Sequence, residues 1–159
     1  MNNKPDNIDT EIPDFQLNQF KNLVNRLFQC CQERIKYQSE RFSLPDAEFR
    51  CLMLFSEERY LTPKGIAAKM NVVKSRVSKI LEGLERRELV QRIRDPEDQR
   101  IFLFSLTRQG QDKLDEINGF LRDIYREVLS QIPSDQRRTS ITTLETLTSS
   151  MNAVKEMMT

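Results

Sequence analysis

The sequence predicts a mainly α-helical protein with one small β-hairpin, in which a helical domain is flanked by longer helices. Three observations support this fold class. Apolar residues recur at helical spacing through most of the 159 residues. Helix-start signals in which Ser or Thr stands close before Pro occur at two points along the chain, residues 43–45 and 62–63. Two short apolar runs surround a polar turn that contains a proline, which is the pattern of a hairpin.

The chain begins with residues 1–14, which are polar and show no helical periodicity, so we expect a flexible N-terminal arm. A helical period starts at Phe15 and runs to about Gln38. Its apolar stripe is formed by Phe20, Val24, Leu27, Phe28, Cys31 and Ile35. This segment is therefore predicted to be one long amphipathic helix.

Two shorter helices are expected next. The run Ser43–Asp46 is a capping-box pattern and predicts a helix over about 45–57. Its apolar residues are Leu52, Leu54 and Phe55. Thr62 and Pro63 give a second start signal, because Thr caps free N–H groups and Pro fits a first helical turn. The apolar side of this short helix carries Ile66, Ala67 and Met70. Asn71 then interrupts the helix, since Asn tolerates the left-handed conformation of a tight turn.

A fourth helix is predicted over about 73–88, and its two faces differ in character. One narrow arc of the helical wheel is apolar and consists of Val73, Val77, Ile80 and Leu84. The opposite arc is polar and consists of Ser75, Lys79, Glu82 and Arg86, flanked by Arg76 and Ser78. The helix should therefore pack on one side and present the other side to solvent.

The hairpin is predicted from residues 89–94 and 101–106, which surround the polar turn 95–99. Thr107 is expected to cap a long helix that runs to about Gln131, and Pro133 precedes a final helix. The apolar stripe of that final helix comprises Ile141, Leu144, Leu147, Met151, Val154 and Met158.

Composition excludes several classes of site. The sequence contains no histidine, which excludes Ser-His-Asp and Cys-His catalysis and histidine metal sites. No P-loop, nucleotide-binding glycine motif or nucleophile elbow is present, so we expect no enzyme, no cofactor and no metal. No apolar run approaches the roughly 20 residues of a membrane span, and the polar N-terminus is unlike a secretory signal. An odd number of cysteines, three, favours the reducing cytoplasm.

Charge is distributed unevenly along the chain. Residues 62–108 hold 11 basic and 6 acidic side chains, whereas the rest of the chain holds 14 basic and 18 acidic ones. A basic middle third in a nearly neutral protein is typical of a polyanion-binding surface. The alternative is a solvated surface in which the charges cluster by chance.

A short helix, a tight turn, an amphipathic helix and a hairpin, in this order, make a winged helix-turn-helix, whose second helix fits the DNA major groove. The polar face of the fourth helix offers four side chains to base edges, namely Ser75, Arg76, Ser78 and Lys79. On the hairpin, or wing, we expect Arg100 to lie along the minor groove, with Asp98 orienting its guanidinium. The alternative is an ordinary salt bridge between Asp98 and Arg100 that fixes the hairpin. Phosphate contacts are expected from Lys74, Arg86, Arg92 and Arg94.

The stretch from Leu61 to Gly110 resembles the MarR family of bacterial transcription regulators. Three motifs carry the resemblance, in the family's order and spacing. They are L-V-x-R at residues 89–92, D-x-R at residues 98–100 and L-T-x-x-G at residues 106–110. Residues 66–70 also resemble the first helix of the family's helix-turn-helix.

This resemblance implies a homodimeric regulator, usually a repressor, that binds pseudo-palindromic double-stranded DNA and is released by a small aromatic or anionic ligand. It also implies a division of the chain into an arm (1–14), a dimerisation helix (15–40), a winged helix-turn-helix DNA-binding domain (41–107) and C-terminal dimerisation helices (108–159). The apolar stripes of the terminal helices agree independently, because a domain of about fifty residues cannot cover them, whereas a two-fold dimer would.

Two residues depart from the family pattern, and one glycine is unusual. Glu88 stands where glycine is common, at the end of the fourth helix, and glutamate is poor in a left-handed cap. The exit to the first strand is therefore expected to differ. Asn71 replaces a common glycine in the turn, which is a milder change. Gly83 indicates a close approach to the fourth helix, or else a tolerated helix glycine that costs about 1 kcal/mol.

Cysteine oxidation is an alternative signal, since Cys30, Cys31 and Cys51 lie in the first two predicted helices and Arg34 is one turn from Cys30. The competing interpretation is that buried cysteines act as small hydrophobes. An aromatic acid could be held by Phe15, Phe20, Phe49, Phe55, Arg59 and Tyr60, unless these residues belong to the core. Two alternatives to a DNA regulator are a winged helix that contacts protein and a hydrolase on a helical scaffold. Nothing in the sequence requires the hydrolase.

Overall fold

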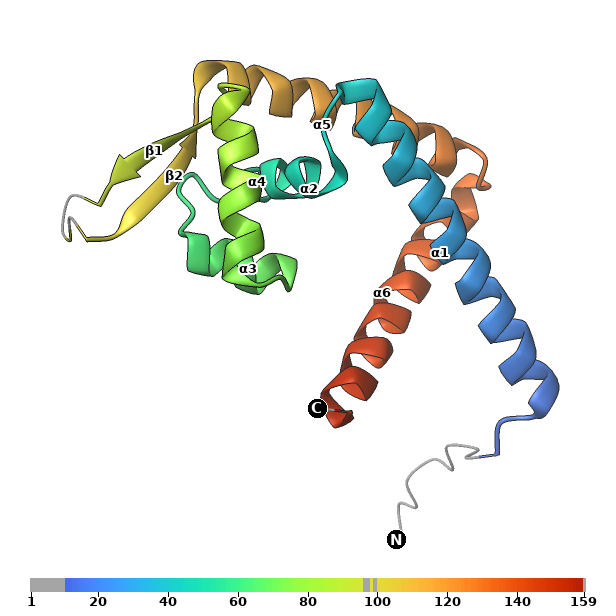
Figure 1. Ribbon diagram of the computed structural model, residues 1–159. Helices are drawn as coiled ribbons and strands as arrows, with labels where there is room; N and C mark the ends of the chain where they lie inside the picture. The colour runs from blue at the N-terminus through green and yellow to red at the C-terminus, as the bar shows by residue number, and fades with distance from the viewer. Residues whose placement is uncertain (1–10, 96–97, 99, 159) are drawn as a thin grey trace, which may run out of the picture.

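The structure is a computed structural model that describes residues 11–95, 98 and 100–158. In this part of the chain it contains six α-helices and a two-stranded hairpin (Figure 1). In chain order the elements are α1 (Asp14–Phe42), α2 (Asp46–Leu54), α3 (Pro63–Met70), α4 (Lys74–Arg86), β1 (Val90–Arg94), β2 (Phe102–Leu106), α5 (Arg108–Ser130) and α6 (Ser134–Met157). The predicted fold class is confirmed. Of the predicted N-terminal arm, residues 1–10 lie outside the described residues.

The hydrophobic core lies where α2, α3, α4, the hairpin and the first half of α5 meet. Its most deeply buried side chains are Cys51, Leu52, Leu61, Ile66, Val77, Leu84, Leu114 and Ile117. In α1 the buried residues are Gln38 and Phe42, both near its end. The Phe42 ring packs edge to face against Phe120 of α5, with 5.4 Å between the ring centroids. The core therefore belongs to the winged helix, and α1 touches it only with its last turns.

Most of the local start and stop signals act as predicted. Thr62 caps α3 and Thr107 caps α5, each by accepting the backbone N–H of the glycine three residues later. Asn71 ends α3 in the left-handed conformation, with φ at 53°. The capping box at residues 43–46 was wrong: Ser43 is itself left-handed and ends α1, and α2 begins after Pro45 without a side-chain cap. The second helix also ends at Leu54, earlier than predicted.

Glu88 adopts the left-handed backbone conformation, which is unfavourable for glutamate. Its φ is 60°, in the left-handed region that favours glycine. The backbone hydrogen bonds at this helix end are nonetheless made. The N–H of Glu88 donates to the carbonyl of Glu85 at 2.8 Å, and the N–H of Leu89 donates to the carbonyl of Leu84 at 3.0 Å. The expectation that the exit from α4 would differ is therefore wrong: it has the shape that a glycine cap would give, at a cost of about 1 kcal/mol for a side chain in this region.

The hairpin is antiparallel, and its register pairs Val90 with Leu106 and Arg94 with Phe102. The segment before α3 adds a third short pairing, in which the backbone of Leu61 exchanges hydrogen bonds of 3.0 and 2.8 Å with Phe104. Side chains alternate between the two faces of the sheet. One face carries Arg92, Arg94, Phe102 and Phe104, and the other carries Gln91, Ile93, Leu103 and Ser105.

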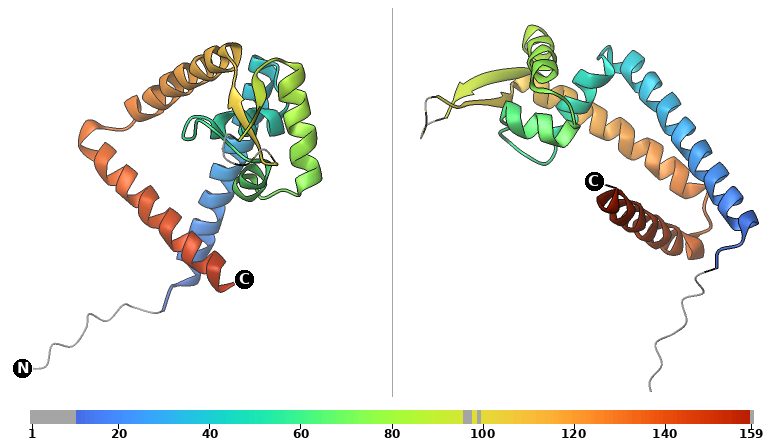
Figure 2. Two further views of the ribbon diagram at one scale, coloured as in Figure 1. Left: turned by 90° about the vertical axis from the view of Figure 1, so that its left-hand side faces the viewer. Right: turned by 60° about the horizontal axis from the view of Figure 1, so that its bottom comes forward.

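The terminal helices leave large apolar surfaces exposed. Figures 1 and 2 show α5 running past the winged helix to a corner, where α6 turns back, while most of α1 projects away. No residue of α6 is buried. Exposed apolar side chains on α1, α5 and α6 include Phe15, Leu17, Phe20, Leu23, Leu27, Phe28, Val128, Ile141, Leu144, Met151, Val154 and Met157. Among the described residues, none of the helices combines the length and the hydropathy of a membrane span.

Candidate nucleic-acid interface

Helix α4 presents its polar face to solvent. Val77, Ile80 and Leu84 are buried on its inner side. Four side chains expected to meet base edges, namely Ser75, Arg76, Ser78 and Lys79, are all exposed. They lie in the first two turns, so a groove that receives the N-terminal end of α4 would meet them together.

Val73 departs from the predicted apolar arc. It precedes the first residue of α4 and its side chain is 69% exposed, so it takes no part in the core. The helical wheel gave the wrong result here because it assumed helical geometry one residue too early. An exposed aliphatic side chain therefore stands beside the four polar ones.

In the hairpin, Asp98 acts on the backbone of Arg100. Its carboxylate accepts the backbone N–H of Arg100 at 3.0 Å, and its carbonyl accepts the N–H of Ile101 at 2.9 Å. Among the described residues, the structure records no salt bridge from Asp98 to the Arg100 guanidinium. The prediction that Asp98 orients this guanidinium is therefore corrected. Asp98 therefore shapes the turn, and the Arg100 side chain stays exposed. Of the predicted turn, residues 96, 97 and 99 lie outside the described residues.

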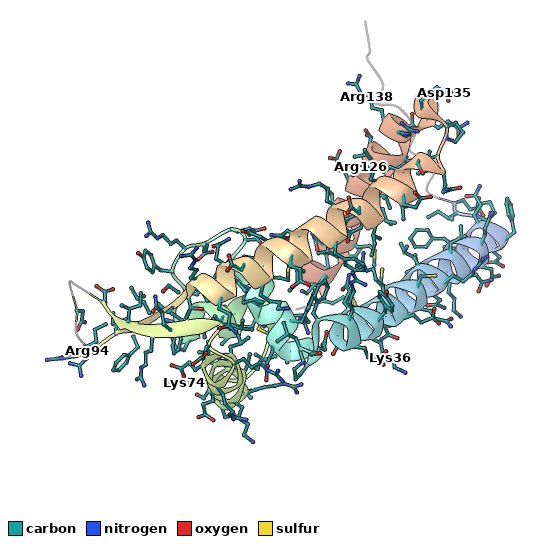
Figure 3. All side chains as sticks on the ribbon, turned by 90° about the horizontal axis from the view of Figure 1, so that it is seen from above. Lys36, Lys74, Arg94, Arg126, Asp135 and Arg138 are labelled. Carbon is teal, nitrogen blue, oxygen red and sulfur yellow. The ribbon has the colours of Figure 1, made fainter. Side chains whose placement is uncertain are left out.

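A cleft of about 590 Å³ separates α4 from the hairpin. Four cationic side chains line it, namely Lys64, Lys74, Arg92 and Arg100, together with the carboxylates of Glu82 and Glu85. Figure 3 shows Lys74 on α4 and Arg94 on the hairpin at the end of the molecule away from Asp135 and Arg138. The cleft thus joins cations from three separate elements beside the polar face of α4.

Lys64 is a residue of this cleft that the sequence did not single out. It lies in the first turn of α3, directly after the Thr62-Pro63 start signal. Only the fold brings that turn next to the hairpin, through the pairing of Leu61 with Phe104. A basic residue just after a helix start was the available signal, and it is too common to have identified the site.

Two of the arginines predicted to contact phosphates lie near one aromatic ring. The Arg92 guanidinium carbon lies 3.4 Å from the ring centroid of Phe102, and that of Arg94 lies 5.9 Å from it. Both distances are within the range of cation–π attraction. Arg86 is placed apart from these groups, because a helix that rises 1.5 Å per residue puts it about 18 Å along α4 from Lys74.

A second cleft, of about 510 Å³, lies on the other face of the hairpin. It brings together Phe55, Arg59 and Tyr60, three of the residues expected to hold an aromatic acid, with Arg108 at the start of α5. The Arg59 guanidinium lies 5.3 Å from the Tyr60 ring centroid. Phe55 is nevertheless buried and belongs to the core, as does Phe49, which is the alternative interpretation of these two residues. Phe15 and Phe20 are exposed on α1 and lie elsewhere.

The three cysteines occupy different environments. Cys30 is exposed, Cys31 is half-buried, and Cys51 is fully buried in α2. Burial, followed by the nearby charge of Glu48, raises the pKa of the Cys51 thiol to about 12. Since the thiolate is the species that is oxidised, Cys51 is chemically protected at neutral pH.

Comparison with known proteins relates the winged helix to one family. The model of the MarR family matches residues 44–102. The uncharacterized HTH-type transcriptional regulator YdgJ of Bacillus subtilis is 27% identical over 68% of this chain and 65% of its own length, so the chain spans less than two thirds of that relative. A MarR family protein from Bacillus stearothermophilus superposes with a TM-score of 0.80 at 18% identity, over 89% of this chain and 99% of that one. The MepR–DNA complex of S. aureus superposes with a TM-score of 0.64 at 20% identity, over 82% and 98% of the two chains. Both structures share this fold.

Proposed function

The chain carries the winged helix of the MarR family at residues 44–102, and from this premise we propose that it is a transcription repressor that binds a pseudo-palindromic DNA operator as a homodimer. The observation that carries the proposal is the cleft between α4 and the hairpin, which joins four cations beside an exposed polar helix face. A duplex is a dense polyanion with a groove wide enough for a helix. We place the protein with DNA in the cytoplasm and assign it no catalytic role.

In this proposal α4 enters the major groove with its first two turns. Arg76 hydrogen-bonds a guanine edge, and Ser75, Ser78 and Lys79 contact bases or nearby phosphates. Arg100 lies along the minor groove, whose negative potential attracts arginine. The hydrogen bond from the Arg100 backbone to Asp98 supports this placement, because it fixes the turn that carries the side chain.

The phosphate backbone follows the cationic side of the cleft. Lys74 and Arg92 contact it there, and we add Lys64 because it lines the same cleft. Arg94 contacts it outside the cleft, on the face of the hairpin that also carries Arg92. Arg86, at the other end of α4, contacts a phosphate outside the cleft. The stacking of Arg92 on Phe102 supports a fixed position for its guanidinium at the moment of binding.

The homodimer is supported by the uncovered faces of α1 and α6. Helix α6 has 24 residues and buries none of them, so packing within one chain contributes little to its stability. Exposed apolar surface of this extent marks an interaction site. A two-fold axis through these helices would also set two copies of α4 about 34 Å apart, one turn of DNA. We assign dimerisation to the regions expected from the sequence, residues 15–40 and 108–159.

Release by a small aromatic or anionic ligand is supported by the second cleft. It offers the guanidinium groups of Arg59 and Arg108 to a negative charge and the exposed ring of Tyr60 to an apolar body, whereas Phe55 lines it from the buried core. Glu57 and Glu58 also line it, and Glu58 is paired with Lys69 at 2.6 Å. The alternative signal is oxidation at Cys30 or Cys31, whereas the raised pKa of Cys51 argues against that residue.

The test is capture of sheared genomic DNA on the purified protein at near-physiological salt, followed by sequencing. We expect enrichment of a few sites that contain an inverted repeat. The matched variant is Arg76→Ala, which should change the order in which sites are enriched; an unchanged order with weaker binding would reduce Arg76 to a phosphate contact. Sedimentation should show a dimer for both proteins.

A winged helix that contacts protein instead of DNA gives the opposite result. It predicts no enriched inverted repeat and little effect of salt. A DNA regulator predicts that the logarithm of affinity falls with the logarithm of salt concentration, by about 0.9 for each phosphate contact. Replacing Lys64 or Lys74 with Ala should lower that slope by about one contact without changing the preferred sequence.

A further inference from the structure

Val73 combines two features that contribute nothing to the stability of the fold. It is the N-cap of α4, with an extended backbone (φ −71°, ψ 153°), and its side chain forms no cap hydrogen bond. It is also 69% exposed, although it is aliphatic. Valine is among the poorest N-cap residues, and its replacement of a capping residue costs about 1 kcal/mol.

The same chain uses threonine for this purpose elsewhere. Thr62 and Thr107 cap α3 and α5 with hydrogen bonds of 3.0 and 2.9 Å. Threonine and valine have nearly the same shape, so one oxygen in place of a methyl group would supply the missing cap at residue 73. The methyl group is therefore present where packing does not use it and where a hydroxyl would stabilise the helix. Local rules are broken in this way mainly at functional sites.

The surroundings of Val73 indicate what the methyl groups contact. The next three residues, Lys74, Ser75 and Arg76, are all exposed and belong to the DNA-facing end of α4. In the major groove the apolar feature of a base edge is the C5 methyl group of thymine. We propose that Val73 contacts a thymine methyl group in each half-site and so contributes to operator choice.

This inference rests on the proposed function, and its test uses the operator selected by the wild-type protein from random duplex DNA. Each thymine of one half-site is replaced in turn by uracil, which pairs identically but lacks the methyl group. For the wild-type dimer we expect one position at which uracil weakens binding about threefold to tenfold. Val73→Ser should lose that discrimination and bind both operators equally.

The serine variant also distinguishes a role of Val73 in DNA recognition from a role in the stability of the fold. Because serine can cap α4, Val73→Ser should raise the denaturation midpoint of the protein while it removes the thymine preference. Val73→Thr keeps one methyl group and adds the cap, so it should retain part of the preference. A role limited to folding would move the midpoint and leave the ratio of thymine to uracil affinity unchanged.

Two results would overturn the inference, and they differ in what else they affect. If the wild-type protein binds its operator but no uracil substitution matters, or the effect persists in Val73→Ser, the contact is absent and the proposed function stands. If the wild-type protein selects no sequence at all, the proposed function fails together with this contact.

Discussion

A Cβ atom on Gly110 would overlap the carbonyl oxygen of Leu89. Gly110 lies in the first turn of α5, and Leu89 directly follows the end of α4. Thr107 ties the same two segments together, because its hydroxyl donates to the carbonyl of Glu88 at 2.5 Å and its N–H to that of Leu89 at 3.1 Å. The glycine of the L-T-x-x-G motif is therefore required by space, since no glycine among the described residues has a positive φ.

Replacing Gly110 with Ala should destabilise the fold by about 1–3 kcal/mol, because a backbone carbonyl cannot move away from the added methyl group. Gly119→Ala, in the same helix, is the matched control. Nothing lies within 4 Å of a Cβ at that position, so the change should stabilise the protein by about 1 kcal/mol through helix propensity. Urea denaturation of the two variants checks both signs. A similar effect of the two substitutions would show that the contact with Leu89 does not constrain α5.

Gly83 should behave differently, because its neighbour is a flexible side chain. A Cβ there would overlap the carboxylate of Glu48, which accepts a hydrogen bond from Arg87 at 2.8 Å. Gly83→Ala should therefore cost about 1 kcal/mol in the wild-type chain by displacing Glu48. In a Glu48→Ala background the same change should stabilise the protein by about 1 kcal/mol, because only the helix propensity remains. A double-mutant cycle measured by urea denaturation tests this reversal, and purely additive effects would contradict it.

Cysteine reactivity should follow exposure. Cys30 is expected to react with iodoacetamide at pH 8 in the folded protein, whereas Cys51, with its pKa raised to about 12, should stay unmodified until urea unfolds the chain. Because the folded-state pKa is raised, this thiol contributes stability below its ordinary pKa of 9.0. That contribution should be lost as the pH rises from there towards 12. Peptide mass spectrometry reads the labelling, and modification of Cys51 in the folded state would contradict its burial.

Arg100→Ala should weaken operator binding several-fold or more while the dimer persists. Asp98→Ala should weaken it to a similar extent, because the carboxylate holds the backbone N–H of Arg100. Asp98→Asn retains an acceptor oxygen and should retain most of the affinity. Fluorescence titration with the selected operator measures all three variants. If Asp98→Asn were as weak as Asp98→Ala, the charge of Asp98 would matter more than its hydrogen bond to the backbone.

Local signals in the sequence were sufficient for the elements of the winged helix. Thr62, Asn71 and Thr107 act through hydrogen bonds or dihedral angles within a few residues, and all three behave as predicted. Ser43 was misassigned because α1 continues to Phe42, whose ring is held by the distant Phe120. Glu88 takes a left-handed conformation against its own preference, because the surrounding fold imposes it.

The candidate site also has features that local sequence predicts and features that depend on tertiary structure. Exposure of the polar face of α4 follows from helical periodicity, so the sequence was sufficient to place Arg76 and Lys79 at the surface. The cleft beside it depends on tertiary structure, because Lys64 reaches it through the pairing of Leu61 with Phe104. The partner of Asp98 could not be predicted either, since residue spacing does not distinguish a guanidinium from a backbone N–H.

Because side chains alternate along β1, the hairpin separates the two clefts. Gln91 and Ile93 line the cleft that holds Arg59 and Tyr60, and Arg92 lines the cleft beside α4. Residues that are joined by a single peptide bond therefore face opposite clefts. A ligand in the cleft beside Arg59 would therefore contact side chains whose immediate sequence neighbours line the cleft beside α4.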